Sequence, residues 1–272
     1  MTTTVLTEVG QSAPGGRPGS AAQLSAAMNA EWIKLRTVRG PRWTLLAGFV
    51  ATVAFGALLS YFMGRNFDPT DGKPFEPVRT AFGGLVLGQL AMVVLGVTVI
   101  GGEYASGMIR LSLAAVPGRG MFFAAKAAVL AAVTLAVGLV TAFTAFFIGQ
   151  AVLGRHGVSL GDPGVLRAVL AGALYPVMIA LIALSVATML RRQTLALGLL
   201  IPFFFLVSTI LQAIPGVTRA TQFLPDQAGQ KALQIHHQSD NAFGPWTGLL
   251  IAVLWVAAAL AGGWLALRGR DA

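Results

Sequence analysis

The stretch from Met121 to Gln150 reads MFFAAKAAVLAAVTLAVGLVTAFTAFFIGQ and contains one charged residue, Lys126. A helix crosses the ~30 Å hydrocarbon core of a bilayer with about 20 apolar residues. This run is longer, so it must tilt, bend or protrude. Lys126 lies near the start of the run, where its side chain is expected to reach the interface. The stretch therefore predicts a membrane-spanning helix.

Other long apolar runs occur along the 272-residue chain, which is 56% hydrophobic and only 11% charged. Soluble domains carry about 25% charged residues, and a soluble core cannot absorb so much apolar sequence. The expected fold class is an all-α polytopic membrane protein with six transmembrane helices. The expected spans cover residues 43–63, 80–101, 121–150, 165–190, 194–214 and 246–267.

The placement of basic residues predicts the orientation of these spans. Most of the 19 Lys and Arg residues fall in the N-terminal segment, the loop at 101–121, the loop at 191–192 and the C-terminal end. A basic excess marks the cytoplasmic side, so both termini are expected in the cytoplasm and the chain in the cell membrane. The charge of +9 follows this topology rather than a nucleic-acid-binding domain.

The segment before the first span divides into two expected parts. Residues 1–20 are rich in Thr, Ser, Gly and Pro and lack an apolar signal-peptide core, which predicts a disordered cytoplasmic tail. Residues 21–40 place Leu24, Met28 and Leu35 on one helical face, which predicts an amphipathic helix along the inner membrane surface. The alternative is a basic flank that only fixes topology.

The loop between the second and third spans reads GGEYASGMIRLSLAAVPGRGM, from Gly101 to Met121. Its residues 103–115 have helix-forming composition interrupted by Gly107, with an apolar ridge and charged flanks. A short helix of this kind suits docking in the groove of a partner protein. An interfacial loop packed on lipid is the alternative.

The chain offers few groups for chemistry. The expected span interiors contain no carboxylate and no histidine, which disfavours a transporter driven by a proton or ion gradient. His236 and His237 lack the further ligands that a metal site needs, so a solvated loop is expected there. The chain contains no cysteine and no phosphate-binding loop, so we expect no enzyme activity, cofactor or metal in it.

Four stretches together resemble a known family. They are EWIKLRTVRGPRWTLL before the first span, GEYASGMIRLSLAAVPGR after the second, FLPDQAGQKAL in the last outer loop, and LALRGRDA at the C-terminus. In order and spacing they resemble the ABC-2 type permease family, the membrane subunits of bacterial ATP-binding-cassette exporters. The resemblance covers nearly the whole chain after about residue 22, with residues 41–272 as the six-span permease domain.

The resemblance implies a partner and a set of contacts. The chain would be a permease half that pairs as a homodimer and binds separate ATPase subunits. Its expected cargo is a drug, a lipid or a peptide. An N-terminal interface helix and a cytoplasmic coupling helix would seat on the ATPase. The expected contact residues are Glu103, Tyr104, Gly107, Met108, Ile109 and Arg110, with Glu31, Lys34 and Arg36 as secondary contacts.

Alternative functions remain open from the sequence. They are a secondary transporter and a membrane anchor that recruits a cytoplasmic partner without transport. An intramembrane enzyme is disfavoured because no span carries a catalytic pair. Gly83, Gly84, Gly88 and Gly96 in the second span are expected at close helix contacts, either within one chain or between two copies.

Overall fold

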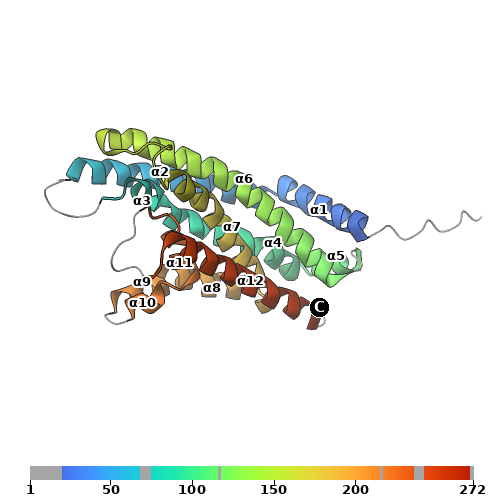
Figure 1. Ribbon diagram of the computed structural model, residues 1–272. Coiled ribbons are helices and arrows are strands. Elements are labelled where there is room, and N and C mark those ends of the chain that lie inside the picture. Colours follow the sequence, from blue (N-terminus) through green and yellow to red (C-terminus); the bar gives the residue numbers. More distant parts are fainter. Residues whose placement is uncertain (1–19, 68–74, 116–117, 215–216, 236–241, 270–272) are drawn as a thin grey trace, which may run out of the picture.

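The computed structural model describes residues 20–67, 75–115, 118–214, 217–235 and 242–269 (Figure 1). Every regular element in these ranges is helical, which confirms the expected all-α class. The expected tail at 1–20 lies outside the described residues apart from Ser20. The elements are α1 Ser20–Thr37, α2 Arg39–Asn66, α3 Pro77–Ala81, η2 Phe82–Gly84, α4 Leu85–Ala105, α5 Ile109–Ala115, α6 Arg119–Leu153, η3 Gly154–His156, α7 Val165–Leu190, α8 Gln193–Pro202, the π-helical turn η4 Phe203–Val207, α9 Ser208–Ala213, α10 Thr218–Thr221, α11 Pro225–Lys231 and α12 Pro245–Gly269.

Six stretches of the described chain are long and apolar enough to cross a membrane, and each overlaps one expected span. Their mean hydropathy over the most apolar window is between 2.0 and 2.3. They are Arg39–Asn66, Pro77–Ala105, Arg119–His156, Val165–Leu190, Gln193–Gln212 and Pro245–Gly269.

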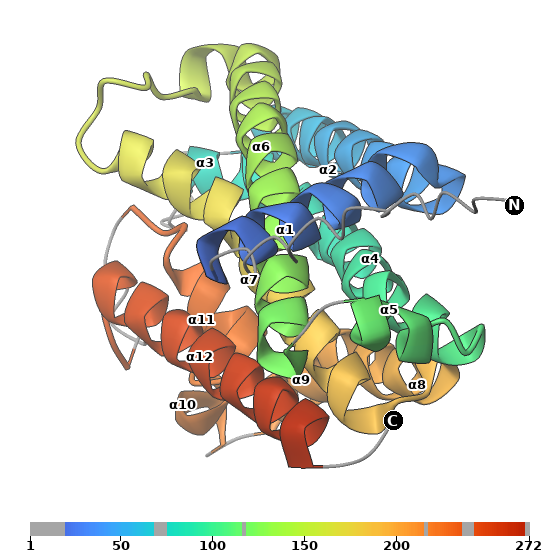
Figure 2. The same cartoon turned by 90° about the vertical axis from the view of Figure 1, so that its right-hand side faces the viewer.

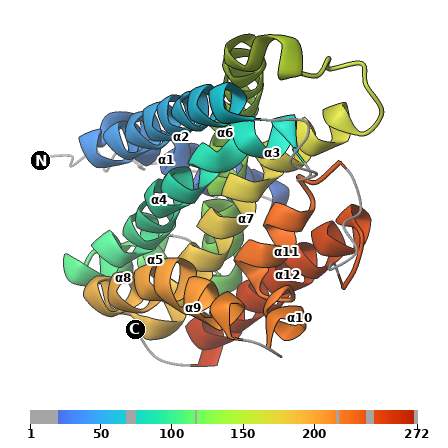
Figure 3. The same ribbon diagram turned by 90° about the vertical axis from the view of Figure 1, so that its left-hand side faces the viewer.

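The fourth span, α7, is the central helix of the bundle. Its most apolar window is 78% buried, whereas that of α12 is 11% buried. Helices α4, α6 and α12 pack around it, as the end-on views show (Figures 2 and 3). The long apolar faces of α2, α8 and α12 stay uncovered within the chain.

Glycines bring α4 against its two neighbours. A Cβ on Gly84 or Gly88 would overlap atoms of Thr52 in α2, and one on Gly96 would overlap the carbonyl oxygen of Ala180 in α7. Small residues let helix backbones approach where lipid supplies no hydrophobic drive. These glycines of the second span therefore serve packing within one chain.

The fifth span is broken into three pieces. α8 ends at Pro202, a π-helical turn follows over Phe203–Val207, and α9 continues from Ser208. Proline has no N–H to donate to the preceding turn, and π-turns often accompany such interruptions.

The two ends of the bundle carry different elements. One end, called the α1 end below, holds α1, α5 and the last turn of α12, while α3, α10 and α11 lie at the opposite end (Figure 1). This grouping follows from six crossings in alternate directions. It agrees with the expectation that alternate loops lie on the same side of the membrane.

Two helix boundaries differ from expectation. The first helix ends at Thr37 instead of residue 40, Val38 is extended, and Pro41 lies in the first turn of α2. Proline suits a first helical turn because the N–H groups there have no acceptor in the helix. Likewise, α4 continues to Ala105, so that Glu103 belongs to the end of the second span.

The loop after the fifth span holds the short helices α10 and α11. Asp226 of α11 is 1% exposed, and its Oδ1 accepts a hydrogen bond from Ser208 Oγ at 3.0 Å. Burial raises the pKa of Asp226 above its ordinary value, although hydrogen bonds from Gln227 and Ser208 oppose this. The helix therefore carries a buried carboxyl group where it packs on α12 and α7.

Candidate functional site

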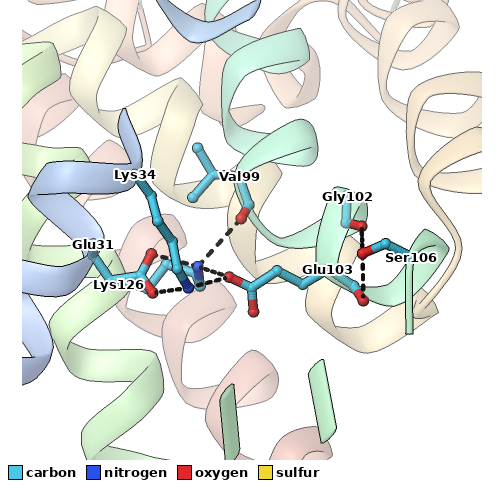
Figure 4. Close-up of polar contacts among 7 residues, drawn as sticks. All are labelled: Glu31, Lys34, Val99, Gly102, Glu103, Ser106 and Lys126. Carbon is cyan, nitrogen blue, oxygen red and sulfur yellow. Dashed lines mark hydrogen bonds and ion pairs between the residues drawn. The ribbon is translucent and has the colours of Figure 1, made fainter. Parts of the chain in front are cut away.

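Four charged side chains from three helices meet near the α1 end (Figure 4). Glu31 and Lys34 come from α1, Glu103 from the last turn of α4, and Lys126 from α6. We call this group the ion cluster. Its two carboxylates and two ammonium groups balance in charge.

Each lysine of the ion cluster bridges both glutamates. Lys126 Nζ donates to Glu31 Oε2 at 2.6 Å and to Glu103 Oε1 at 2.9 Å. Lys34 Nζ donates to Glu31 Oε1 and to Glu103 Oε1, both at 2.9 Å. Lys126 also donates to the carbonyl oxygen of Val99 at 3.3 Å. The bonds therefore tie α1, α4 and α6 together.

The ion cluster is graded from buried to exposed. The side chain of Lys126 is 1% exposed and that of Glu31 is 7%, whereas that of Lys34 is 41%. Burial alone lowers the pKa of Lys34, but its bonds to Glu103 and Glu31 and their charges raise the pKa overall. Removing one partner of a buried ion pair leaves the other charge uncompensated. The buried part of the cluster, formed by Lys126 and Glu31, is therefore a structural joint.

The expected behaviour of Lys126 differs from its place in the structure. We expected its side chain to reach the membrane interface, but it is buried beside the ring of Phe122, 5.0 Å from the ring centroid. The reason is α1, which lies across α6 and supplies Glu31. The sequence offered one signal, the isolation of Lys126 within an apolar run.

A tight corner follows Glu103 and ends α4. Ser106 N donates to the carbonyl oxygen of Gly102 at 3.0 Å, and its Oγ donates to the same oxygen at 2.7 Å. Gly107 has φ of +70°, a left-handed conformation that glycine adopts without strain and that commonly ends helices. The chain then turns into α5, which begins at Ile109.

A groove of about 480 Å³ lies between α1, the start of α2 and the end of α4. Glu31, Lys34 and Glu103 contribute to its wall, with Val99 and Met108. Glu103 Oε2 is buried and has no hydrogen-bond partner among the described residues. The ion cluster and the α4–α5 corner thus border one cavity.

The chain matches the model of a known protein family. The model is described as ABC-2 family transporter protein, and it matches residues 27–216. The chain belongs to the ABC-2 transporter family. A comparison with curated proteins yields no match. The family match includes the ion cluster and the α4–α5 corner, and it confirms the resemblance found in the sequence.

The ABC-2 transporter chain brings three of the nine expected contact residues together. Glu31, Lys34 and Glu103 all belong to the ion cluster. Arg36 is exposed on α1. Glu31 is the most buried of these four expected contact residues, because it lies on the face of α1 that packs against α6.

The other five expected residues form the corner of this ABC-2 transporter. Met108 is 50% exposed and Arg110 is exposed, so both side chains are accessible from the α1 end. Ile109 is 5% exposed and packs into the core. Tyr104 is partly buried, and Gly107 provides the turn. That these residues contact an ATPase stays a prediction.

No group of three or more His, Asp or Glu side chains that could hold a metal ion occurs in the described ranges. The pair His236 and His237 lies outside them.

Proposed function

We propose that this ABC-2 transporter chain is the permease subunit of an exporter whose energy comes from ATP hydrolysed by a separate ATPase subunit. The cargo would be a drug, a lipid or a peptide. The observation that carries the proposal is the α4–α5 corner, which presents exposed side chains at one end of the bundle while Glu103 joins it to two other helices.

The exposed part of the corner is the proposed docking surface. Met108 is 50% and Leu111 69% exposed, and Arg110 lies between them. Apolar side chains beside a guanidinium suit a groove with an acidic rim on the partner. Ile109 is buried beneath them, so a force on α5 reaches the core through packed atoms.

The ion cluster is the proposed path from the docking surface to the spans. Closure of two ATPases on ATP would displace α5 and the end of α4. Glu103 is bonded to Lys34 of α1 and Lys126 of α6, so the displacement would move three helices together. ATP can drive this change only by binding the closed state more tightly than the open one.

The proposed orientation places the α1 end in the cytoplasm. Lys34, Arg36, Arg110, Arg191 and Arg268 lie on elements of that end, and basic residues favour the cytoplasmic side. Two copies would pair through apolar faces that one chain leaves uncovered, as on α2 and α12.

Coexpression with an ATP-binding-cassette ATPase subunit from the same organism tests the proposal. Arg110→Glu should reduce copurification of the ATPase and ATP-dependent export while membrane insertion is unchanged. Arg155→Glu is the matched control, because Arg155 is exposed at the opposite end of the bundle. Equal copurification with Arg110→Glu and the native chain would contradict the docking role.

The alternatives give different results in the same system. A membrane anchor would bind its partner but move no cargo upon ATP addition. A secondary transporter would move cargo against its gradient in proteoliposomes that contain the purified chain and an ion gradient without ATP.

A further inference from the structure

A second groove lies at the corner where α7 turns into α8. It has a volume of about 1090 Å³ and is bordered by the end of α4 and the first turns of α8. The polar end of the groove is formed by Tyr104, Arg191, Arg192 and Thr194. We call it the α7–α8 groove. It is separate from the ion cluster and from the exposed side chains of α5.

The corner contains two consecutive arginines, and both border the groove. Arg191 ends α7 with φ of +54°, and Arg192 is extended immediately before α8. Arg191 Nη2 donates to the carbonyl oxygen of Ala266 at 3.3 Å, which holds this side chain against α12. Arg192 is exposed. The corner therefore fixes one arginine and leaves its neighbour accessible.

Two further features favour an anion at this end. The first N–H groups of a helix have no acceptor within it, and those of α8 begin at Gln193 on the groove wall. Tyr104 Oη is buried and has no hydrogen-bond partner within the described part of the chain. No carboxylate contributes to the groove wall in that part.

The remainder of the groove is apolar. Leu195, Leu197, Gly198 and Ile201 continue its wall along α8, within the fifth span. Leu195 and Leu199 of the same helix are 53% and 55% exposed. An anionic head at the arginines and an acyl chain along α8 would satisfy both parts of the wall. A free phosphate would leave the apolar part unfilled.

We propose that the α7–α8 groove binds one anionic phospholipid, with its phosphate at Arg191, Arg192 and Tyr104 and an acyl chain along α8. A zwitterionic headgroup is less suited because its ammonium group finds no carboxylate on the described wall. The proposal does not rest on the proposed function, and of the residues expected to contact an ATPase only Tyr104 borders the groove.

Native mass spectrometry of the purified full chain in detergent tests the site with phosphatidylglycerol and phosphatidylcholine of equal acyl composition. We expect one phosphatidylglycerol to be retained in preference to phosphatidylcholine. Arg192→Gln should weaken that binding roughly fivefold, the contribution of one basic residue at a membrane surface. Arg155→Gln, an exposed arginine at the opposite end, should leave it unchanged.

A second variant tests the apolar part of the groove. A Cβ on Gly198 would meet no atom within 4 Å, so the side chain of Gly198→Leu would begin in open space and should exclude the acyl chain. Weaker phosphatidylglycerol binding by Gly198→Leu and no displacement by millimolar inorganic phosphate would support a lipid site. The same melting temperature of each variant in lipid-free detergent shows that the fold is retained.

Three results would overturn the proposal. They are equal retention of the two lipids, equal losses for Arg192→Gln and Arg155→Gln, and displacement of phosphatidylglycerol by inorganic phosphate. A disulfide between copies carrying Leu195→Cys, formed in place of lipid binding, would assign the groove to a second copy of the chain and would also overturn it.

Discussion

Lys126 Nζ lies 2.6 Å from Oε2 of Glu31, a residue 95 positions earlier in the chain. Both side chains are buried, and they join the helix before the first span to the third span. The N-terminal helix is therefore part of the transmembrane bundle's packing. A force applied to either helix reaches the other through this pair.

Replacing Lys126 should destabilise the protein strongly. Lys126→Met leaves Glu31 and Glu103 buried near each other without their main cation, and breaking a buried ion pair costs about 3–5 kcal/mol. Lys34→Met should cost much less, because that side chain is 41% exposed and water replaces part of the interaction. Denaturant unfolding in detergent micelles measures both.

A double variant separates the contribution of the Glu31–Lys126 pair to stability from that of Lys126 alone. Glu31→Gln combined with Lys126→Met removes one buried charge of each sign, so part of the lost stability should return. Coupling energies of contacting residues are about 0.5–3 kcal/mol. Strictly additive losses would show that the two side chains do not interact.

The turn after α4 should require glycine. Gly107 has φ of +70° and open space around it, so Gly107→Ala should cost about 1 kcal/mol through backbone strain alone. Gly102→Ala is the matched comparison, since Gly102 is helical, has equal space, and alanine favours a helix by up to about 1 kcal/mol. Thermal unfolding should shift in opposite directions for the two variants.

The contact of α2 with the start of the second span should not tolerate a side chain. A Cβ on Gly84 would overlap the backbone carbonyl of Thr52, which cannot move without displacing α2. Overpacking of this kind costs about 1–3 kcal/mol. We expect Gly84→Ala to lower the melting temperature, whereas Gly40→Ala, with no atom within 4 Å, should have little effect.

Asp226 should make the protein less stable as the pH rises. Its folded-state pKa is raised by burial, so ionisation costs more in the folded than in the unfolded chain. Below about pH 4 the carboxyl group is protonated in both states and this cost is absent. Asp226→Asn should therefore raise the melting temperature at neutral pH, by an amount that shrinks toward pH 4.

The matched control for that pH profile is Asp162→Asn, because Asp162 is exposed at the same end of the bundle. A stabilisation by Asp226→Asn that stays constant from pH 4 to pH 8 would assign the effect to packing instead of ionisation.

The six spans were predictable because hydrocarbon thickness imposes a length and a composition on each helix. The ion cluster was not, since Glu31 and Lys126 are joined only by the way α1 crosses α6. The apolar face of α1 with Leu24 and Met28 was visible in the sequence, but no local pattern indicated a buried glutamate on it. In the structure that glutamate is buried, because Lys126 offsets the cost of its charge.

The α4–α5 corner was partly predictable. Gly107 marked the interruption and Arg110 an accessible position, as the structure shows. The burial of Ile109 depends on the depth at which α5 meets α6, which local sequence does not encode. Likewise, nothing in the pattern of Arg191 and Arg192 indicated the groove beside them.

Helix α6 is continuous over 35 residues, which corresponds to about 50 Å. Lys126 lies near one tip, and Gly149, which packs on Ala81 of α3, lies near the other. A rigid rod that pivots about its midpoint swings its two tips in opposite directions. A sideways displacement of α6 at Lys126 would then displace Ala81 in the opposite direction, so that one unbroken helix would couple the two ends of the bundle.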